Sequence, residues 1–249
     1  MIKVSVIISS YNCNRELKNT FYSISRQKTN FDFEVCYIDD CSYEDPKFIY
    51  DNFLRVKHKK GIRLKQHIGS LGNSKKFNNQ HYTFKNSFSM LLDMVSSESK
   101  IIFLNHGDVI MTTNDTLQKM VDSLEPKKIK VPDVRTVFVP EDLYINYEDG
   151  IQKALIGFEN KPLYQGHNRD SLAPTLLCLY KEDLYNLDYD ISPHEVYLKI
   201  KMKEQGYEIS RYDELVGIHQ FHSSRPSIHF LNPNQALSWS AKYPEKEEY

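Results

Sequence analysis

Two apolar, β-branched segments near the N-terminus share one pattern, because each ends in small polar residues. The first is Val-Ser-Val-Ile-Ile-Ser-Ser-Tyr-Asn at residues 4–12, and the second is Phe-Glu-Val-Cys-Tyr-Ile-Asp-Asp-Cys-Ser at residues 33–42. Continuous apolar runs of this length are typical of parallel strands covered on both faces of a sheet. The pattern therefore predicts two buried strands whose C-terminal ends are polar.

The segment between these strands, residues 15–27, has a polar face and an apolar face at helical spacing. The apolar positions are Leu17, Phe21 and Ile24. This spacing predicts an amphipathic helix, and Asn14 can cap its start. A strand, a helix and a strand within about 30 residues form a βαβ unit with a right-handed crossover.

Ligands of open α/β sheets bind in the crevice outside the carboxyl ends of the strands. Four polar side chains stand at those ends of the two predicted strands: Tyr11, Asn12, Asp39 and Asp40. Since parallel strands carry their carboxyl ends to the same edge of the sheet, we expect these four residues to share one site.

Apolar periodicity predicts further elements along the chain. Strands are expected at residues 61–64, 100–110, 127–140 and 174–180, and from Tyr207 onward. Helices are expected at residues 47–53, 84–95, 112–124 (with Asn114 or Thr113 as its cap), 193–206 and 234–242. Residues 144–164 have an irregular pattern. Strands that alternate with helices predict an α/β fold with a mixed, mostly parallel sheet flanked by helices.

Length and composition exclude several classes of protein. A chain of 249 residues can bury a full core, and α/β proteins of this size often form one domain. A net charge of −1 gives no indication of nucleic-acid binding. No apolar run approaches the roughly 20 residues of a membrane helix, and the N-terminus has the pattern of a strand rather than a signal sequence. The four cysteines have neither metal nor disulfide spacing, which indicates reduced thiols in a cytoplasmic protein.

The motif Val-Ile-Ile-x-x-Tyr-Asn at residues 6–12, then a helix, then Ile-Asp-Asp-Cys-Ser at residues 38–42, resembles the opening of the family 2 glycosyltransferases. The resemblance implies the GT-A fold in a single domain that binds a nucleotide-sugar. It implies that Asp39 contacts the base and that Tyr11 stacks or packs against it. Because a carboxylate accepts the imide N–H of uracil, UDP is the favoured nucleotide, and GDP stays open. Position 9, often proline in the family, is Ser9 here.

The same resemblance divides the chain into two halves and an extension. Residues 1–110 would bind the nucleotide-sugar and residues 111–225 the acceptor, while residues 226–249 would pack over the acceptor side or mediate association. Residues 66–73 suit a loop whose backbone approaches a ligand closely, and the family places a nucleotide-binding loop here, which implicates Gly72. Lys85 stands where relatives carry an arginine. A simple turn is the alternative interpretation of the loop.

Relatives carry an Asp-x-Asp motif at the end of the strand expected at residues 100–110, where its carboxylates bind a divalent cation that bridges the donor's diphosphate. Here the sequence is Asn-His-Gly-Asp at residues 105–108, so that only Asp108 keeps a carboxylate. Oxygen ligands suit Mn²⁺ or Mg²⁺. We therefore expect Asp108, Asn105 and His219 to bind a metal ion, and Asn105 and His106 to contact the donor. The alternative is an ordinary turn at a strand end.

The general base of inverting relatives is the Asp of a Glu-Asp-Val-x-Leu motif. Here His194 and Glu195 stand at those positions, at the start of a predicted helix, where the helix dipole favours an ionised acid. Glu195 is therefore the candidate catalytic base, and an ordinary first-turn acid is the alternative. His194 and His222 are candidates for phosphate or acceptor binding.

These residues together predict a transferase that moves a sugar from a UDP-sugar to an acceptor hydroxyl with inversion, in surface polysaccharide or glycoconjugate synthesis. The acceptor would be a glycan or a lipid-linked molecule. The basic residues between positions 55 and 65 would attract diphosphate or anionic lipid, which adds peripheral contact at the inner face of a membrane, or would form a solvated edge. Two alternatives stay open: a catalytically degenerate binding relative, and a nucleotidyltransferase, which lacks support because no glycine follows the first strand.

Overall fold

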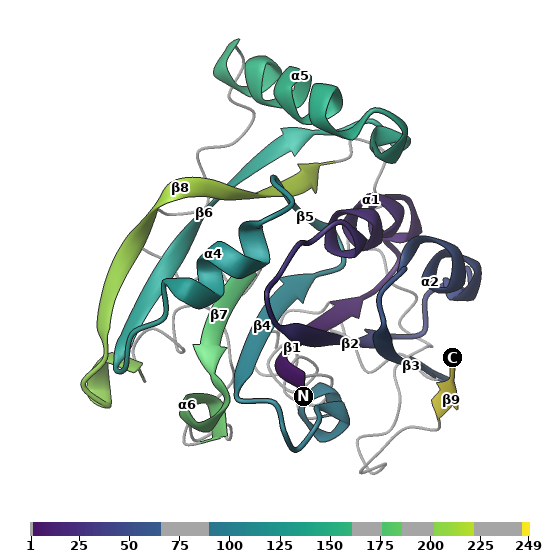
Figure 1. Ribbon diagram of the computed structural model, residues 1–249. Coiled ribbons are helices and arrows are strands. Elements are labelled where there is room, and N and C mark those ends of the chain that lie inside the picture. Colours follow the sequence, from purple (N-terminus) through teal and green to yellow (C-terminus); the bar gives the residue numbers. More distant parts are fainter. Residues whose placement is uncertain (1, 66–89, 161–175, 186–201, 222–245) are drawn as a thin grey trace, which may run out of the picture.

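The computed structural model describes residues 2–65, 90–160, 176–185, 202–221 and 246–249, and it confirms the α/β fold (Figure 1). Within these ranges six strands form a main sheet in the order β7-β4-β1-β2-β3-β9, and three form a second sheet in the order β5-β8-β6. The main sheet comprises β1 (Ile2–Ser10), β2 (Asp32–Asp39), β3 (His58–Leu64), β4 (Ile101–His106), β7 (Leu176–Tyr180) and β9 (Lys246–Glu248). Strands β1 to β4 pair in parallel, whereas β7 and β9 join antiparallel.

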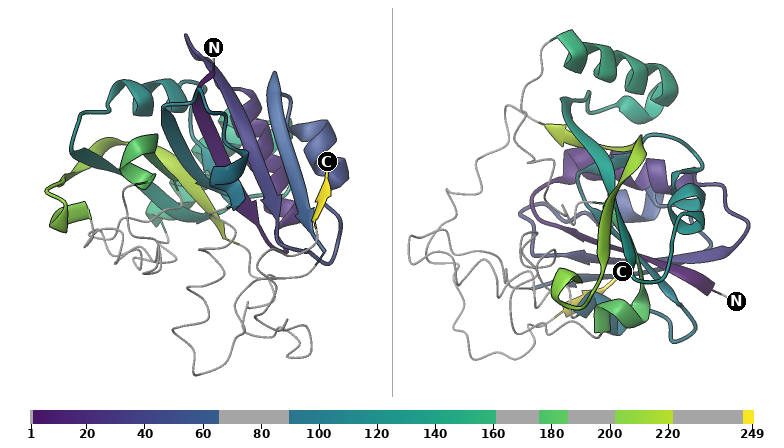
Figure 2. Two further views of the ribbon diagram at one scale, coloured as in Figure 1. Left: turned by 90° about the horizontal axis from the view of Figure 1, so that it is seen from below. Right: turned by 90° about the vertical axis from the view of Figure 1, so that its left-hand side faces the viewer.

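Helix α1 (Asn14–Ser25) makes the expected crossover from β1 to β2. Its apolar side chains are fully buried against the sheet: Leu17, Phe21 and Ile24. Complete burial of such a side chain stabilises the fold by about 1.5–3 kcal/mol. Helix α2 (Lys47–Phe53) lies beside α1 on the same face of the main sheet, as the views in Figures 1 and 2 show. The opposite face has its own apolar cluster, which includes residues of the helical segment 90–94 and of α6 (Lys181–Tyr185).

The second sheet contains β5 (Val109–Met111), β6 (Lys128–Phe138) and β8 (Glu208–Phe221). Strand β8 runs parallel to β6 and antiparallel to β5, with Val109 opposite His219. Helix α4 (Thr116–Asp122) connects β5 to β6. The 3₁₀ turn η1 (Leu143–Ile145) and helix α5 (Tyr147–Asn160) pack on this sheet. Because β5 directly follows β4, the second sheet brings residues from beyond position 200 to the end of the main sheet.

Three expectations about local structure are wrong. Residues 147–160 form helix α5, because Tyr147 and Ile151 lie one turn apart and are both buried, while acidic residues in the first turn favour the helix dipole. The N-cap of α1 is Cys13 rather than Asn14, whose amide donates to the Glu44 carbonyl at 3.0 Å. Helix α4 has Asp115 as its N-cap, in place of Asn114 or Thr113.

The end of the C-terminal segment joins the main sheet. Residues 246–248 pair with Ile62, Arg63 and Leu64 of β3. This position is the edge of the main sheet farthest from β7, in the half expected to bind the nucleotide. For residues 246–248 the structure shows pairing with β3, while packing of the extension over the acceptor side or a role in association stays a prediction. The helix expected at 234–242 lies outside the described residues.

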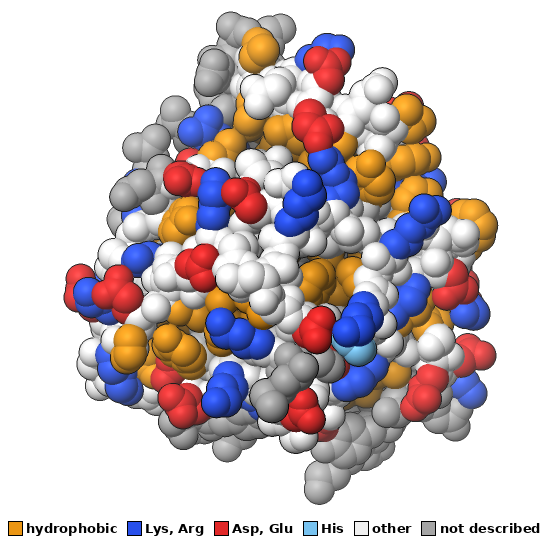
Figure 3. Space-filling model, in the orientation of Figure 1, with side chains coloured by type: hydrophobic (Ala, Val, Ile, Leu, Met, Phe, Trp, Pro, Cys, Tyr) orange, Lys and Arg blue, Asp and Glu red, His pale blue; other side chains and the backbone are white. Residues whose placement is uncertain are grey.

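Part of the basic segment at residues 55–65 is neutralised by acidic residues of the neighbouring strand β2. Lys57 lies 3.4 Å from Asp32, and Lys60 lies 2.9 Å from Glu34. Over the face shown in Figure 3, Lys and Arg side chains alternate with Asp and Glu. These contacts favour a solvated edge over an anion-attracting surface. Among the helices that the structure describes, none is long and apolar enough to cross a membrane.

Candidate functional site

Parallel pairing brings the polar ends of three strands to one edge of the main sheet. Ser10 of β1 lies opposite Asp39 of β2, and Ser9 lies opposite His106 of β4. The structure thus places these candidate residues at the same edge: Tyr11, Asn12, Asp39, Asp40, Asn105 and His106. The convergence expected from the strand pattern is confirmed, whereas the contact that each residue makes with a ligand stays a prediction.

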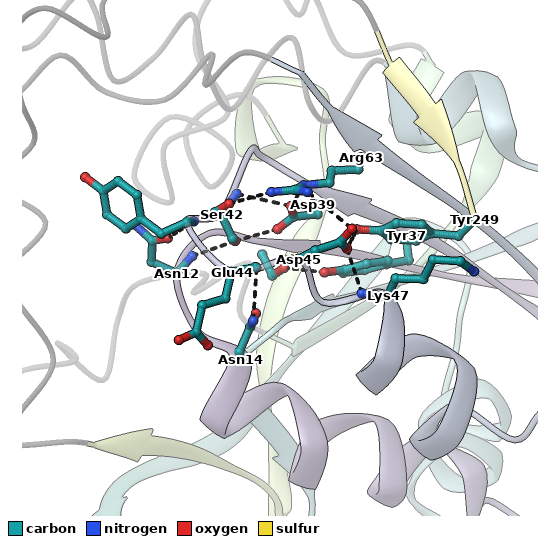
Figure 4. Close-up of polar contacts among 12 residues, drawn as sticks. Asn12, Asn14, Tyr37, Asp39, Ser42, Glu44, Asp45, Lys47, Arg63 and Tyr249 are labelled. Carbon is teal, nitrogen blue, oxygen red and sulfur yellow. Dashed lines mark hydrogen bonds and ion pairs between the residues drawn. The ribbon is translucent and has the colours of Figure 1, made fainter.

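Asp39 fastens the loop that follows β2 (Figure 4). Its Oδ1 accepts a hydrogen bond from the Ser42 hydroxyl at 2.5 Å, and its Oδ2 accepts one from the Ser42 amide at 3.1 Å. The Arg63 guanidinium lies 3.3 Å from the same carboxylate, whose side chain is 0% exposed. Burial raises the pKa of Asp39 to about 6, although Ser42 and Arg63 act in the opposite direction. In this conformation the carboxylate holds its own loop in place.

Asn12 joins the end of β1 to the same loop. Its amide N–H donates to the Ser42 hydroxyl at 2.9 Å, and its side-chain oxygen accepts from the Tyr43 amide at 2.9 Å (Figure 4). The backbone of Asn12 (φ 48°) and of Cys41 (φ 59°) is left-handed, a conformation that asparagine tolerates and that costs other non-glycine residues about 1–2 kcal/mol. The hydrogen bonds to Ser42 therefore maintain a loop geometry that the chain alone disfavours.

The expected metal-binding residues meet at the junction of the two sheets. The antiparallel pairing of β5 with β8 brings His219 to Asp108, with Nε2 3.3 Å from Oδ2. Asn105 is 2% exposed, and its Nδ2 donates to the carbonyl oxygens of His106 (2.8 Å) and Val109 (3.1 Å). Its Oδ1 is buried and has no hydrogen-bond partner among the described residues.

Gly107 has no space for a side chain. A Cβ at this position would lie 2.7 Å from the Ser10 Cβ, 3.1 Å from the Cys13 sulfur and 3.2 Å from the Ser9 carbonyl oxygen. Real Cβ atoms essentially never approach another heavy atom more closely than 3.0 Å. The residue aligned with the second carboxylate of the Asp-x-Asp motif therefore has to be glycine in this backbone.

The residues present form only part of a divalent-ion site. One carboxylate, one imidazole and the buried amide oxygen of Asn105 are acceptable ligands for Mn²⁺ or Mg²⁺. No group of three or more His, Cys, Asp or Glu residues that could hold a metal ion occurs in the described part of the chain. These residues alone therefore do not fit a complete site, and further ligands would have to come from elsewhere.

Gln220 connects the second sheet to helix α1, a role that the sequence pattern did not indicate. It is 1% exposed, and its Nε2 donates to the Glu16 carbonyl (3.0 Å) and to the Thr20 hydroxyl (3.1 Å). Its Oε1 accepts from Asn19 at 3.0 Å, and its backbone N–H donates to the Asp108 carbonyl at 2.9 Å. Gln220 therefore fixes β8, and with it His219, against the turn that carries Asp108.

Other candidate residues fall outside the described part of the chain: Gly72, Lys85, His194, Glu195 and His222. Sequence reasoning in turn missed Ser42, Arg63 and Tyr249, which organise the loop after β2. An Asp with a Ser three residues later is a local signal for such a loop. Arg63 and Tyr249 had no local signal, because their places follow from the pairing of β3 with β2 and β9.

The comparison with known proteins agrees with this geometry. Residues 5–174 match the model of the family described as glycosyl transferase family 2, which covers more than half of the chain. The chain therefore belongs to glycosyl transferase family 2. No curated protein matches the chain.

Solved structures show the same fold at low identity. The mannosyltransferase PcManGT from Pyrobaculum calidifontis, in complex with GDP-Man and Mn²⁺, has a TM-score of 0.53 at 17% identity over 90% of this chain and 58% of its own. S. aureus TarS 1–349, in complex with UDP-GlcNAc, has a TM-score of 0.55 at 17% identity over 89% of this chain and 59% of its own. The chain thus spans less than two thirds of these proteins, and at this identity the likeness establishes the GT-A fold alone.

Proposed function

We propose that the chain transfers a sugar from a nucleotide-sugar to an acceptor hydroxyl, with UDP-sugars as the favoured donors. The observation that carries this proposal is the convergence of the β1, β2 and β4 ends, where Asn12 and Asp39 hold one ordered loop. Family membership and neighbours in complex with GDP-Man and UDP-GlcNAc support this class of donor. Because those neighbours differ in their nucleotide, GDP stays a second candidate.

The direct test is a binding screen against nucleotides and nucleotide-sugars. A ligand present at about 100 times its dissociation constant adds about 2.7 kcal/mol to the free energy of unfolding, which raises the melting temperature. We expect such a shift for UDP or a UDP-sugar, with ATP as the comparison. Asp40→Asn should reduce the shift if the expected contact of this carboxylate with the donor is correct. A screen in which no nucleotide changes the melting temperature would contradict the proposal.

The proposed mechanism gives two roles to residues of the chain. Glu195 would remove the proton from the acceptor hydroxyl as its oxygen attacks the anomeric carbon, which inverts the configuration. Asp108, His219 and Asn105 would bind Mn²⁺ or Mg²⁺ weakly, and the ion would neutralise charge on the leaving diphosphate. The Mn²⁺ bound to the neighbour PcManGT supports the ion, while the lack of space for a side chain at Gly107 limits the ligands that the chain can offer. The acceptor would be a glycan or a lipid-linked molecule, in a cytoplasmic setting at the inner face of a membrane.

Gly107 also favours a second candidate function. A chain that cannot carry the second carboxylate of the motif would suit a relative that binds a nucleotide-sugar without transferring the sugar. A coupled assay separates the two candidates, because only the transferase releases a nucleoside diphosphate, such as UDP, from the bound donor. Release of UDP or GDP by the parent protein would exclude the binding-only candidate.

A further inference from the structure

The last described residue of the chain makes contact with the loop at residues 39–45, which carries the candidate donor-binding residues Asp39 and Asp40. Strand β9 places Tyr249 beside Gly61, whose carbonyl accepts the Tyr249 amide at 2.8 Å. The Tyr249 ring lies nearly parallel to that of Tyr37, with centroids 6.1 Å apart, and 5.2 Å from that of Tyr50. A Cβ at residue 61 would lie 2.9 Å from the Tyr249 ring, so that only glycine leaves room for it.

The Tyr249 hydroxyl begins a chain of polar contacts that reaches Asp39 (Figure 4). The hydroxyl donates to Asp45 Oδ1 at 3.1 Å, and the other carboxylate oxygen of Asp45 lies 3.3 Å from the Arg63 guanidinium. Arg63 also donates to the Ser42 carbonyl at 2.8 Å and lies 3.3 Å from Asp39. Both ends of the loop at residues 39–45 are thus attached to one arginine.

The loop requires this support, because its backbone is not one that the sequence prefers. Cys41 is left-handed at φ 59°, and the fully covered Asp39 carboxylate already uses both oxygens to hold Ser42. Asn12 and Asn14 hold residues 42–44 from the other side of the loop, and Arg63 and Asp45 hold its two ends, so loss of the Asp45 contacts removes one side of this support. Asp45 connects the loop to three other parts of the structure. Besides its contacts with Tyr249 and Arg63, its Oδ1 accepts the Lys47 amide at 2.8 Å, at the start of α2.

We propose that Tyr249 and Arg63 are positioning residues for donor binding: the C-terminal strand fixes the loop at residues 39–45 through Asp45, so that nucleotide affinity depends on Tyr249. This proposal rests on the proposed function for its ligand. Under this proposal Tyr249 acts through Asp45 and makes no contact with the nucleotide. Removal of its hydroxyl should raise the dissociation constant and the KM of the donor while kcat stays unchanged.

Two matched variants test the proposal. Tyr249→Phe removes the hydroxyl and keeps the ring, whereas Tyr50→Phe removes a hydroxyl from the same ring cluster with no contact to Asp45. The first measurement is amide hydrogen exchange of residues 42–47 in the ligand-free protein, and the second is the dissociation constant for UDP and for GDP. One hydrogen bond corresponds to roughly a two- to tenfold change, and we expect this change in both measurements for Tyr249→Phe only.

The outcomes separate this proposal from the proposed function. If the parent binds UDP or GDP and Tyr249→Phe changes neither the affinity nor the loop exchange, the positioning role is overturned. Equal effects of Tyr249→Phe and Tyr50→Phe would overturn it too, since they would indicate general loosening of the ring cluster. A parent protein that binds no nucleotide would contradict the proposed function and the nucleotide part of this proposal. Loop exchange would then decide whether Tyr249 positions the loop.

Discussion

The imidazole Nε2 of His219 lies 3.3 Å from the carboxylate Oδ2 of Asp108, although the two residues belong to different halves of the sequence. The contact exists because β5 follows the main sheet directly and pairs with β8. Asp108 and His219 were both expected near a metal ion, and the structure brings them together. The same junction also shows why a second carboxylate ligand is missing, because Gly107 has no space for a side chain.

Gly107→Ala should destabilise the protein, and Gly107→Asp should not create a metal site. The added Cβ would meet Ser10 at 2.7 Å and Cys13 at 3.1 Å, and overpacking of this kind costs about 1–3 kcal/mol. Urea denaturation measures the loss. Ser10→Gly removes the closest contact together with the hydrogen bond between the Ser10 and Tyr37 hydroxyls, so the reference is Ser10→Gly alone, and Gly107→Ala should cost less in that background than in the parent. A fully stable Gly107→Asp variant with tighter Mn²⁺ binding would contradict this view of the turn.

Asn105→Asp should lower stability in the absence of metal. The Asn105 amide nitrogen donates to two carbonyl oxygens, and a carboxylate oxygen in its place would repel both, at a cost of about 1–3 kcal/mol. If an ion binds beside Asp108, MnCl₂ should raise the melting temperature of this variant more than that of the parent. Asn146→Asp, at an exposed position on the chain, is the control and should change little. Equal stability of Asn105→Asp and parent in chelator would contradict the hydrogen-bond assignment.

Asp39 should make stability fall as the pH rises from about 4 to about 6. The folded-state pKa of about 6 lies above the ordinary value near 4, so the folded protein holds this proton more tightly than the unfolded chain does. The stabilising contribution is complete below pH 4 and lost above pH 6, and it amounts to about 3 kcal/mol. Urea denaturation of the parent and of Asp39→Asn across this range measures how much Asp39 contributes to the free energy of unfolding at each pH. Parallel pH curves for the two proteins would show that Asp39 does not titrate there.

Gln220→Leu should cost about 2–3 kcal/mol, because the buried amide and its partners on α1 lose their hydrogen bonds. The exposed Gln152 on α5 provides the matched control, since Gln152→Leu should stay within about 0.5 kcal/mol of the parent. If Gln220 also holds His219 in register, Mn²⁺ binding should weaken in Gln220→Leu. A loss no larger than that of the control would remove Gln220 as a connection between the sheets.

Glu195→Gln tests the proposed base without a large change of shape. Loss of a general base typically lowers the rate by about 10²–10⁴-fold, while donor affinity and melting temperature should stay close to those of the parent. An ordinary first-turn acid would instead change stability by a few tenths of a kcal/mol and leave transfer intact. Transfer rate and melting temperature, measured on the same preparation, decide between the two.

Local patterns predicted what depends on local physics. The β1-α1-β2 unit and the convergence of polar residues at its strand ends follow from apolar periodicity, and both are present in the structure. Helix α5 was missed because its aromatic and acidic residues obscured the spacing of Tyr147 and Ile151. The contacts of Arg63, Gln220 and Tyr249 depend on which strands pair and in what register, and no property of the local sequence determines that choice.

The pairing of β9 with only part of β3 has a consequence for association between molecules. An exposed sheet edge offers unpaired N–H and C=O groups that can template aggregation. Along β3, residues 62–64 are covered by β9, and the remaining stretch carries His58, Lys59 and Lys60. Lysine on an edge strand discourages the approach of another strand. Within the described residues, the outer edge of the sheet therefore consists of β9, a strand of only three charged residues, and of the lysine-bearing start of β3, and both features discourage strand addition.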